Sequence, residues 1–507
     1  MRARPQRFSF LIKIGAAILL AAAFDWLFPD EPGGISIGAF ALLWLLALIL
    51  VRPAVRRARM ASAIALSLAA LFCIALLYDP GPLAWLLFLC AVSIAALLPR
   101  TAGFDDAWRW AVRLGVHGLS GPFTPLIDLL RLMPVQPRGS RRPTARSLAA
   151  LLALPLIGTA AFTILFANAN PVIAELFSRL RLPLPGEVVK WAIATLLVWP
   201  ALRPHRLVTR LGASIPEPAI GLPGASLPSV LLALALFNIL FAIENGLDIA
   251  FLWSGAPLPA GMTIPEYVHR GAYPLIATAL LAGFLVLTML RPGSATASHA
   301  WARRLVALWV GQNVFLVASS ALRTIKYVEL YDLTAWRIAA LAWMALVAIG
   351  LVLICWRVWF GRSARWLINA NAFAAALVLV PCCFIDLRAT AAQWNVRHAR
   401  EVGGTGSPID LCYLHRMGAP ALLPLIEFEQ RPLPPELRHR VQFVRGQILD
   451  AMILRQSRWW SWTPHDAMRL SRARMLLGPN APRIGGPRDC DGHVPETAPL
   501  LTGAPAQ

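Results

Sequence analysis

Acidic and amide side chains interrupt one apolar stretch of the sequence, Phe237 to Trp253. Those that share one face of a helix are Asn238, Glu244, Asn245 and Asp248. At about 100° per residue they fall within an arc of about 120°, so the rest of the helix suits acyl chains. A carboxylate near the bilayer interior costs at least about 2.5–3.5 kcal/mol, so two of them need cationic partners or a water-filled cavity. The stretch therefore predicts a buried polar site in a membrane protein.

A second apolar helix would supply the matching positive charges. Its polar residues are Gln312, Ser319, Arg323 and Lys326, whose spacings place them within about 60° on one side of a helix. We expect the two cations at the depth of the two carboxylates, because opposite charges remove each other's desolvation cost. Two interpretations stay open, a structural ion pair and the wall of a ligand or ion cavity. The lining of such a cavity would be Asn238, Glu244, Asn245, Asp248, Gln312, Arg323 and Lys326.

Other charged and aromatic residues follow the same ends of the predicted helices. They form a predicted outer rim of His269, Arg270, Tyr327, Asp332, Asp386, Arg397 and His398. Such residues together could bind an anionic or sugar-bearing substrate. Interfacial aromatics beside neutralising charges are equally typical of any membrane rim, so the sequence assigns no catalytic residue.

The composition is that of a membrane protein. Of the 507 residues, 58% are hydrophobic and 14% charged, and the apolar residues stand in long blocks. The net charge of +21 follows the ends of those blocks, so anionic lipid headgroups are the expected partners and nucleic acid is not. Protein partners cannot be predicted. No nucleotide-binding or zinc-protease motif is present, and we predict neither a cofactor nor a metal site.

The blocks predict an all-α bundle of about eleven transmembrane spans. We expect them at about 8–28, 35–51, 61–77, 82–98, 147–167, 188–203, 228–252, 272–290, 302–322, 336–356 and 366–386. Basic loops alternate with acidic, neutral or mixed loops in every case but the ambiguous loop 323–335, which places the N-terminus in the cytoplasm. An odd number of spans then places the region after Asp386 outside.

Five regions follow from this organisation. We expect four transmembrane helices in 1–98, a basic cytoplasmic loop with amphipathic helices in 99–146, the main bundle of helices five to eleven in 147–386, a helical extramembrane region in 387–476 and a disordered tail in 477–507. In the loop, Asp105, Arg109, Arg113 and His117 recur every four residues, which favours a helix on the headgroups with His117 solvated.

Two features of the extramembrane region are predicted more closely. Ser407 and Pro408 are expected to begin a helix that Gly418 ends. Cys412 and Cys490 can form a disulfide only in an oxidising compartment.

Three runs carry a resemblance to a known family: NGLDIAFLWSGAPLPAGMTIPEYVHRGAYPLIATALLAGFLVL (245–287), NVFLVASSALRTIKYVELYDLTAWRIAALAWM (313–344) and LINANAFAAALVLVPCCFIDLRATAAQWNVRHAREVGG (367–404). They resemble a family of bacterial multi-pass membrane proteins that is catalogued as a domain of unknown function, the 4153/4173 group. The resemblance implies an integral inner-membrane protein of Gram-negative bacteria. It implies no catalytic or binding residues.

Three functions fit these observations. The first is transport or lipid handling in the cell envelope through an outward-facing polar cavity. The second is a signalling or assembly scaffold that presents the C-terminal helices to a partner. The third is a membrane-embedded enzyme for a lipid-linked substrate, with histidine or aspartate as acid or base.

Overall fold

The protein is an all-α bundle in the computed structural model, as predicted. The structure describes residues 4–29, 33–56, 60–101, 103–132, 186–205, 208, 226–254, 278, 281, 285, 299–404, 406–479 and 482–494. Among these residues there is no strand, and seven helices are long and apolar enough to cross a membrane. Two shorter apolar helices match the predicted spans at 35–51 and 188–203. The spans predicted at 147–167 and 272–290 lie wholly or mostly outside the described residues, so the count of eleven stays a prediction.

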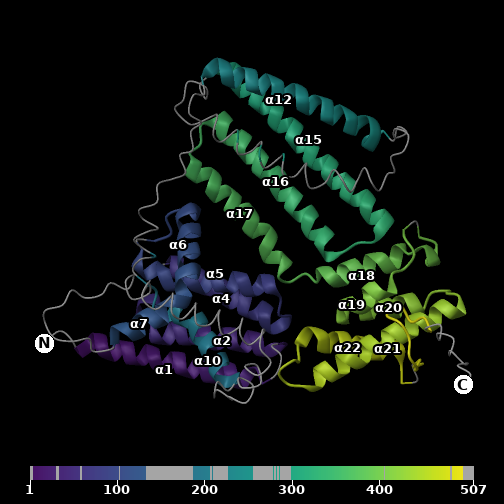
Figure 1. Ribbon diagram of the computed structural model, residues 1–507, viewed down its shortest axis with the longest axis horizontal. Helices are drawn as coiled ribbons and strands as arrows, with labels where there is room; N and C mark the ends of the chain where they lie inside the picture. The colour runs from purple at the N-terminus through teal and green to yellow at the C-terminus, as the bar shows by residue number, and fades with distance from the viewer. Residues whose placement is uncertain are drawn as a thin grey trace, which may run out of the picture.

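The N-terminal helices surround one hydrophobic core (Figure 1). They are α1 (Arg4–Leu27), α2 (Ile35–Val51), α3 (Pro53–Arg56), α4 (Met60–Tyr78), α5 (Pro82–Leu97) and α10 (Gly186–Leu202). Phe40, Trp44 and Phe88 form its aromatic centre. At Gly38 an added Cβ would lie 2.5 Å from the backbone nitrogen of Leu77, so only glycine permits the close approach of α2 to α4.

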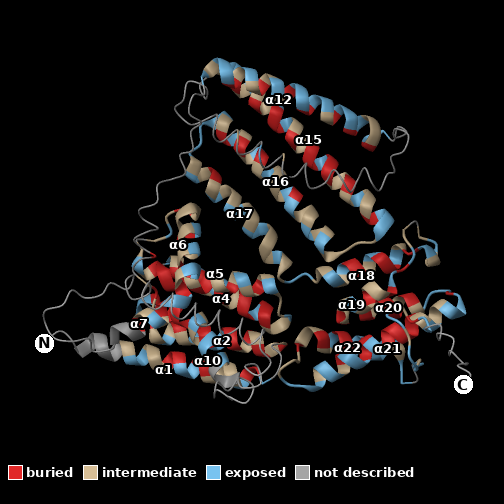
Figure 2. Ribbon diagram, in the orientation of Figure 1, coloured by how far each residue is buried: buried red, intermediate tan, exposed pale blue. Residues whose placement is uncertain are grey.

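Four longer helices lie side by side in a second group (Figure 1). They are α12 (Leu227–Asp248), which continues into a π-helical turn at Ile249–Trp253, α15 (Ala300–Tyr331), α16 (Ala335–Phe360) and α17 (Ala364–Cys382). Trp309 packs between Phe237 and Phe241, at centroid distances of 5.0 and 5.7 Å. Many residues of this group are exposed (Figure 2), and the exposed ones include large apolar side chains such as Leu236, Ile239, Trp343 and Phe373, as expected for helices that face lipid.

The C-terminal helices form a third core. They are α18 (Leu387–His398), α19 (Leu411–Met417), α20 (Leu422–Glu429), α21 (Pro435–Ser457) and α22 (Pro464–Leu477). Gly418 ends α19 as predicted, but the predicted N-cap is wrong. Asp410 caps this helix by accepting from the Tyr413 amide, whereas the Ser407 hydroxyl donates to Asp332 from another segment.

Part of the predicted disordered tail is also ordered. The Arg445 guanidinium donates to the Pro482 carbonyl at 2.7 Å, and Arg440 pairs with Asp491 at 3.1 Å. Together with a disulfide at Cys490, these contacts fix residues 482–494 against α19 and α21. The Pro and Gly-rich composition does not reveal such long-range anchors.

The helices of the predicted cytoplasmic loop differ from the prediction in their packing. They are α6 (Ala107–Ser120) and α7 (Thr124–Leu132), and α6 packs on α5 and α17. Arg113 and His117 are buried, so the expected solvated face is wrong at these two positions. Arg113 binds both carboxylate oxygens of Asp105, at 2.6 and 2.9 Å. Burial, followed by the charge of Arg52, lowers the pKa of His117 to about 4, which keeps its ring neutral.

The ends of the apolar helices sort into two sides of the molecule. We call the C-terminal side the one at which α18–α22 lie, since they contact the ends of α2, α4 and α17. At the opposite side Arg52 donates to the carbonyls of Ala96 and Ala201, which ties together the ends of α2, α5 and α10. The start of α17 also lies there, because Asn369 accepts from the Ala107 amide of α6 at 2.8 Å.

Candidate functional site

Polar side chains join α12 to α15 along a line that we call the α12–α15 seam: Asn238, Glu244, Asn245, Asp248, Gln312, Ser319 and Arg323. The two helices run parallel. Asn238 donates to the Leu305 carbonyl at 3.0 Å and accepts from Gln312 at 3.0 Å, and Asn245 donates to the Gln312 carbonyl at 3.2 Å. Farther along, the Trp253 indole donates to Ser319 at 3.1 Å. Much of the predicted polar stripe therefore serves as interhelical hydrogen bonds.

The ion pair predicted between these helices is present. Arg323, 2% exposed, donates to the carboxylate of Asp248, which is fully buried. Glu244 lies 3.9 Å from the same guanidinium and keeps 42% of its side chain exposed. Lys326, the second predicted cation, makes no ion pair within the described part of the chain. The seam thus brings two carboxylates to one guanidinium.

Two amide oxygens in the seam lack a donor. They are Oδ1 of Asn245 and Oε1 of Gln312, both buried and unpaired among the described residues. Buried acceptors of this kind are usually satisfied, so each marks a place for a water, a cation or a ligand donor. Both residues also take part in the hydrogen bonds between the helices, since Asn245 donates to the Gln312 carbonyl and the Gln312 side chain donates to Asn238.

Asp332 is the residue of the predicted rim that is held most closely by its neighbours. This residue connects α15 to α16 at a φ of 68°, a conformation that costs a non-glycine residue about 1–3 kcal/mol. Ser407 donates to the carboxylate of Asp332. Asn395 holds the next residue, Leu333, by accepting from its backbone amide at 2.7 Å and donating to its backbone carbonyl at 3.0 Å. Burial raises the pKa of Asp332, a shift that the Ser407 hydrogen bond opposes and the charge of Asp410 increases.

The other rim residues do not converge on Asp332. Tyr327 stacks on Tyr331 and against the guanidinium of Arg337. Arg397 pairs with Glu427 at 3.5 Å, and the ring of His398 stacks on Trp394 at 3.7 Å. His269 and Arg270 lie outside the described residues. The described rim is therefore a set of local contacts.

Asp386 belongs to a network that sequence reasoning missed, which we call the α22 junction: Asp79, Asp386, His465, Asp466 and Arg469. Asp386 caps α18 and accepts from Arg469, which also pairs with Asp466. Nδ1 of His465 lies 3.0 Å from the carboxylate of Asp79, and Nε2 lies 3.3 Å from Arg469. The hydrogen bond from His465 lowers the pKa of Asp79.

Three ligand atoms of this junction lie within 4.8 Å of one another, on Asp79, Asp386 and His465, which is close enough for one metal ion. The guanidinium of Arg469 already occupies Asp386 and lies beside His465, so a cation there would meet a fixed positive charge. We therefore interpret the cluster as a charge network that docks α22. No signal in the sequence connects Asp79 with a histidine 386 residues away.

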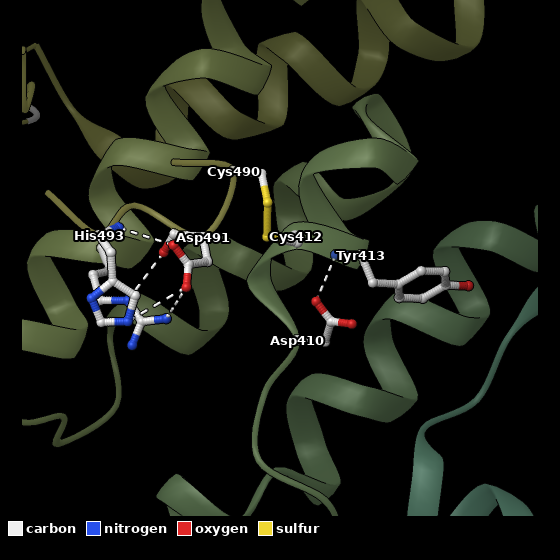
Figure 3. The surroundings of a disulfide bond; sticks show 7 residues. Asp410, Cys412, Tyr413, Cys490, Asp491 and His493 are labelled. Atoms are coloured by element: carbon white, nitrogen blue, oxygen red, sulfur yellow. Dashed lines mark hydrogen bonds and ion pairs between the residues drawn. A yellow bond between two sulfur atoms is a disulfide. The ribbon is translucent and has the colours of Figure 1, made fainter. Parts of the chain in front are cut away.

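A disulfide joins the C-terminal helices to the chain beyond them (Figure 3). Cys412 at the start of α19 is bonded to Cys490, and Asp491 next to it accepts from the His493 amide at 3.0 Å. The free cysteines among the described residues are Cys73, Cys90, Cys355, Cys382 and Cys383. The bonded pair thus lies within the C-terminal region, and the free cysteines lie in or next to the apolar helices.

Comparison with known families identifies the architecture. The family described as "Domain of unknown function (DUF4153)" matches residues 60–428, which is more than half of the chain. The chain belongs to this family. The DUF4153 match includes the α12–α15 seam and Asp332 but ends in α20, before α21 and α22.

One curated relative matches a short part of the chain. It is NADH-quinone oxidoreductase subunit N of Deinococcus radiodurans, 43% identical over 54 residues, which are 11% of each protein. The chain therefore spans about a tenth of that relative. No solved structure matches this chain.

Proposed function

We propose that this DUF4153 protein handles or transports a lipid or ionic ligand in the bacterial inner membrane, with the α12–α15 seam as its ligand site. The partly exposed carboxylate of Glu244 carries the proposal. Glu244 keeps 42% of its side chain exposed beside the buried pair of Asp248 and Arg323. An exposed carboxylate on an apolar helix suits a cation or an ammonium headgroup, and the acceptors on Asn245 and Gln312 suit its N–H groups or its hydration shell.

The orientation that we propose puts the C-terminal side in the periplasm. The disulfide between Cys412 and Cys490 supports it, because disulfides persist in oxidising compartments. The arginines that join helix ends at the opposite side, Arg52 and Arg100, support it as well, since basic residues accumulate in the cytoplasm. A reporter active only in the periplasm, fused after residue 507, would be active; reporter activity confined to the cytoplasm would refute this orientation.

Glu244→Gln tests the proposed site. We expect a strain with this variant to show the lipid and envelope-stress profile of a strain that lacks the gene, while the protein accumulates at the wild-type level. Glu329→Gln is the matched control, since Glu329 is an exposed carboxylate on α15 outside the seam. A wild-type profile with Glu244→Gln would show that the Glu244 carboxylate is not required for function. Degradation of the variant would assign it a structural role.

The C-terminal helices favour a second candidate, an assembly scaffold. They have their own core and disulfide, and α22 docks onto the end of α4 through His465 and Asp79, while Arg469 ties α22 to the start of α18. A scaffold requires these helices for function even when the seam is intact. Truncation after Glu401 should then abolish function while the membrane part accumulates. Full function of the truncated chain would exclude the scaffold.

A further inference from the structure

A groove lies between the antiparallel helices α21 and α22. Its volume is about 500 Å³, within the range of ligand sites. Ile453, Leu470 and Met475 give it an apolar lining, and Trp462 from the connecting turn contributes an aromatic wall. A lining of this kind accommodates a hydrocarbon chain.

One polar side chain in the groove has no partner. Both Nε2 and Oε1 of Gln456 are buried, and neither makes a hydrogen bond with any described residue. A buried primary amide normally satisfies its donors and its acceptor. A ligand with an ester, hydroxyl or phosphate group next to a hydrocarbon chain would supply the missing partners.

The charge of the groove is positive. Arg474 is the one ionisable side chain among the described residues that line it, and no carboxylate of that lining opposes it. A guanidinium binds phosphate oxygens through two parallel hydrogen bonds. The groove is therefore complementary to an anionic headgroup.

The groove begins where the C-terminal helices meet the membrane helices. Trp462 lines the groove, and its carbonyl accepts from the Ile35 amide at the start of α2 at 2.7 Å. The ring of Trp459 contacts that of Trp26 near the end of α1 in a tilted arrangement, at a centroid distance of 4.9 Å. Tryptophans concentrate at the headgroup level of a bilayer, so this end of the groove lies within reach of lipid.

We propose that the groove between α21 and α22 binds an anionic phospholipid, with an acyl chain along Leu470 and Met475 and the phosphate at Arg474. Gln456 hydrogen bonds to the polar region between chain and headgroup. The inference rests on the proposed lipid handling, because it names a second contact for the same class of ligand. It places this contact outside the residues that define the DUF4153 match.

Photolabelling of the full-length protein in nanodiscs tests this proposal. The probe is phosphatidylglycerol with a photoactivatable acyl chain, and labelled peptides are identified by mass spectrometry. We expect labelling of α22, reduced about tenfold by Ser471→Trp, which fills the groove from its exposed rim. Met468→Trp is the matched control, because Met468 is exposed on the same helix outside the groove lining.

A second variant tests the headgroup contact. Arg474→Gln should weaken labelling by photoactivatable phosphatidylglycerol more than labelling by the phosphatidylcholine analogue, because it removes the cation and leaves the apolar lining. An intact Cys412–Cys490 disulfide on a non-reducing gel shows that each variant folds. Equal α22 labelling in the wild type and Ser471→Trp would overturn the proposal, as would competition by an acidic amphipathic peptide but not by phosphatidylglycerol. We expect Glu244→Gln to leave the labelling of α22 unchanged. The groove proposal and the seam proposal can therefore fail independently of one another.

Discussion

The α12–α15 seam and the α22 junction both use a buried arginine to hold segments together, but in different surroundings. Arg323 joins two apolar helices, and its partner Asp248 is fully buried. Arg469 joins α22 to Asp386 near Asp79, which remains half exposed where the extramembrane helices meet the bundle. Solvent does not reach Asp248, so water cannot readily replace a lost partner there, whereas at the junction water is available. The same side chain should therefore contribute very different amounts in the two places.

Loss of Arg323 should have the largest effect. Arg323→Met removes the guanidinium that the buried Asp248 contacts, and removal of one partner of a buried pair costs about 3–5 kcal/mol. We expect a lower midpoint of thermal unfolding in detergent and reduced accumulation in the membrane. Arg304→Met, at an exposed position of α15, is the control.

The double variant Arg323→Met with Asp248→Leu separates charge from packing. An apolar pair of similar volume is often neutral relative to a buried ion pair, so we expect most of the lost stability to return. A double variant as unstable as Arg323→Met alone would show that Asp248 is not the group left uncompensated.

At the junction the expected effect is smaller. Arg469→Gln removes hydrogen bonds to two carboxylates, for which the cost is about 2 kcal/mol because charged groups are involved. The loss should appear as faster proteolysis between α18 and α19, while the unfolding midpoint of the membrane helices stays unchanged. Arg472→Gln, exposed on the same helix, should change neither. A lower unfolding midpoint of the membrane helices in Arg469→Gln would show that the α22 junction stabilises the whole protein, as the α12–α15 seam does.

Asn238→Leu measures an uncharged contact in the seam. It removes the bonds to Leu305 and Gln312, and interhelical hydrogen bonds in membranes contribute about 0.6 kcal/mol on average. We expect a shift in the unfolding midpoint well below that of Arg323→Met. An equal shift would mean that the amide ladder, not the ion pair, holds the two helices together.

The contrast between the two regions also explains what the sequence could predict. The seam lies on two helices whose polar residues recur with helical period, so an ion pair between these helices follows from the pattern. Lys326 shares that period, yet periodicity alone does not tell which of two nearby cations is the partner. The junction joins Asp79 to His465 across 386 residues, and no local pattern encodes such a contact.

The same limitation applies elsewhere in the chain. A polar helical face such as that of α6 has one sequence pattern whether it meets headgroups or other helices, which explains the error at His117. Ser407 is a residue type that favours helix caps, but its hydroxyl donates to Asp332 in a tertiary contact that the local sequence does not reveal. The helices themselves were predictable because apolar length and caps are local properties.

The pH dependence of docking offers the finest comparison, through Asp79. The hydrogen bond from His465, opposed by burial and helped by the charges of His465 and Arg469, holds the pKa of Asp79 below its ordinary value of 3.8. A carboxyl group whose pKa is lower in the docked form stabilises that form at pH values above its ordinary pKa of 3.8. This stabilisation disappears as the pH falls through the lower pKa of the docked form. Asp79→Asn should therefore increase proteolysis between α18 and α19 slightly at pH 7, and wild type and variant should converge below about pH 3.8. The effect is small because solvent screens the half-exposed carboxylate. A difference between wild type and variant that persists at lower pH would mean that Asp79 acts through packing and not through its charge.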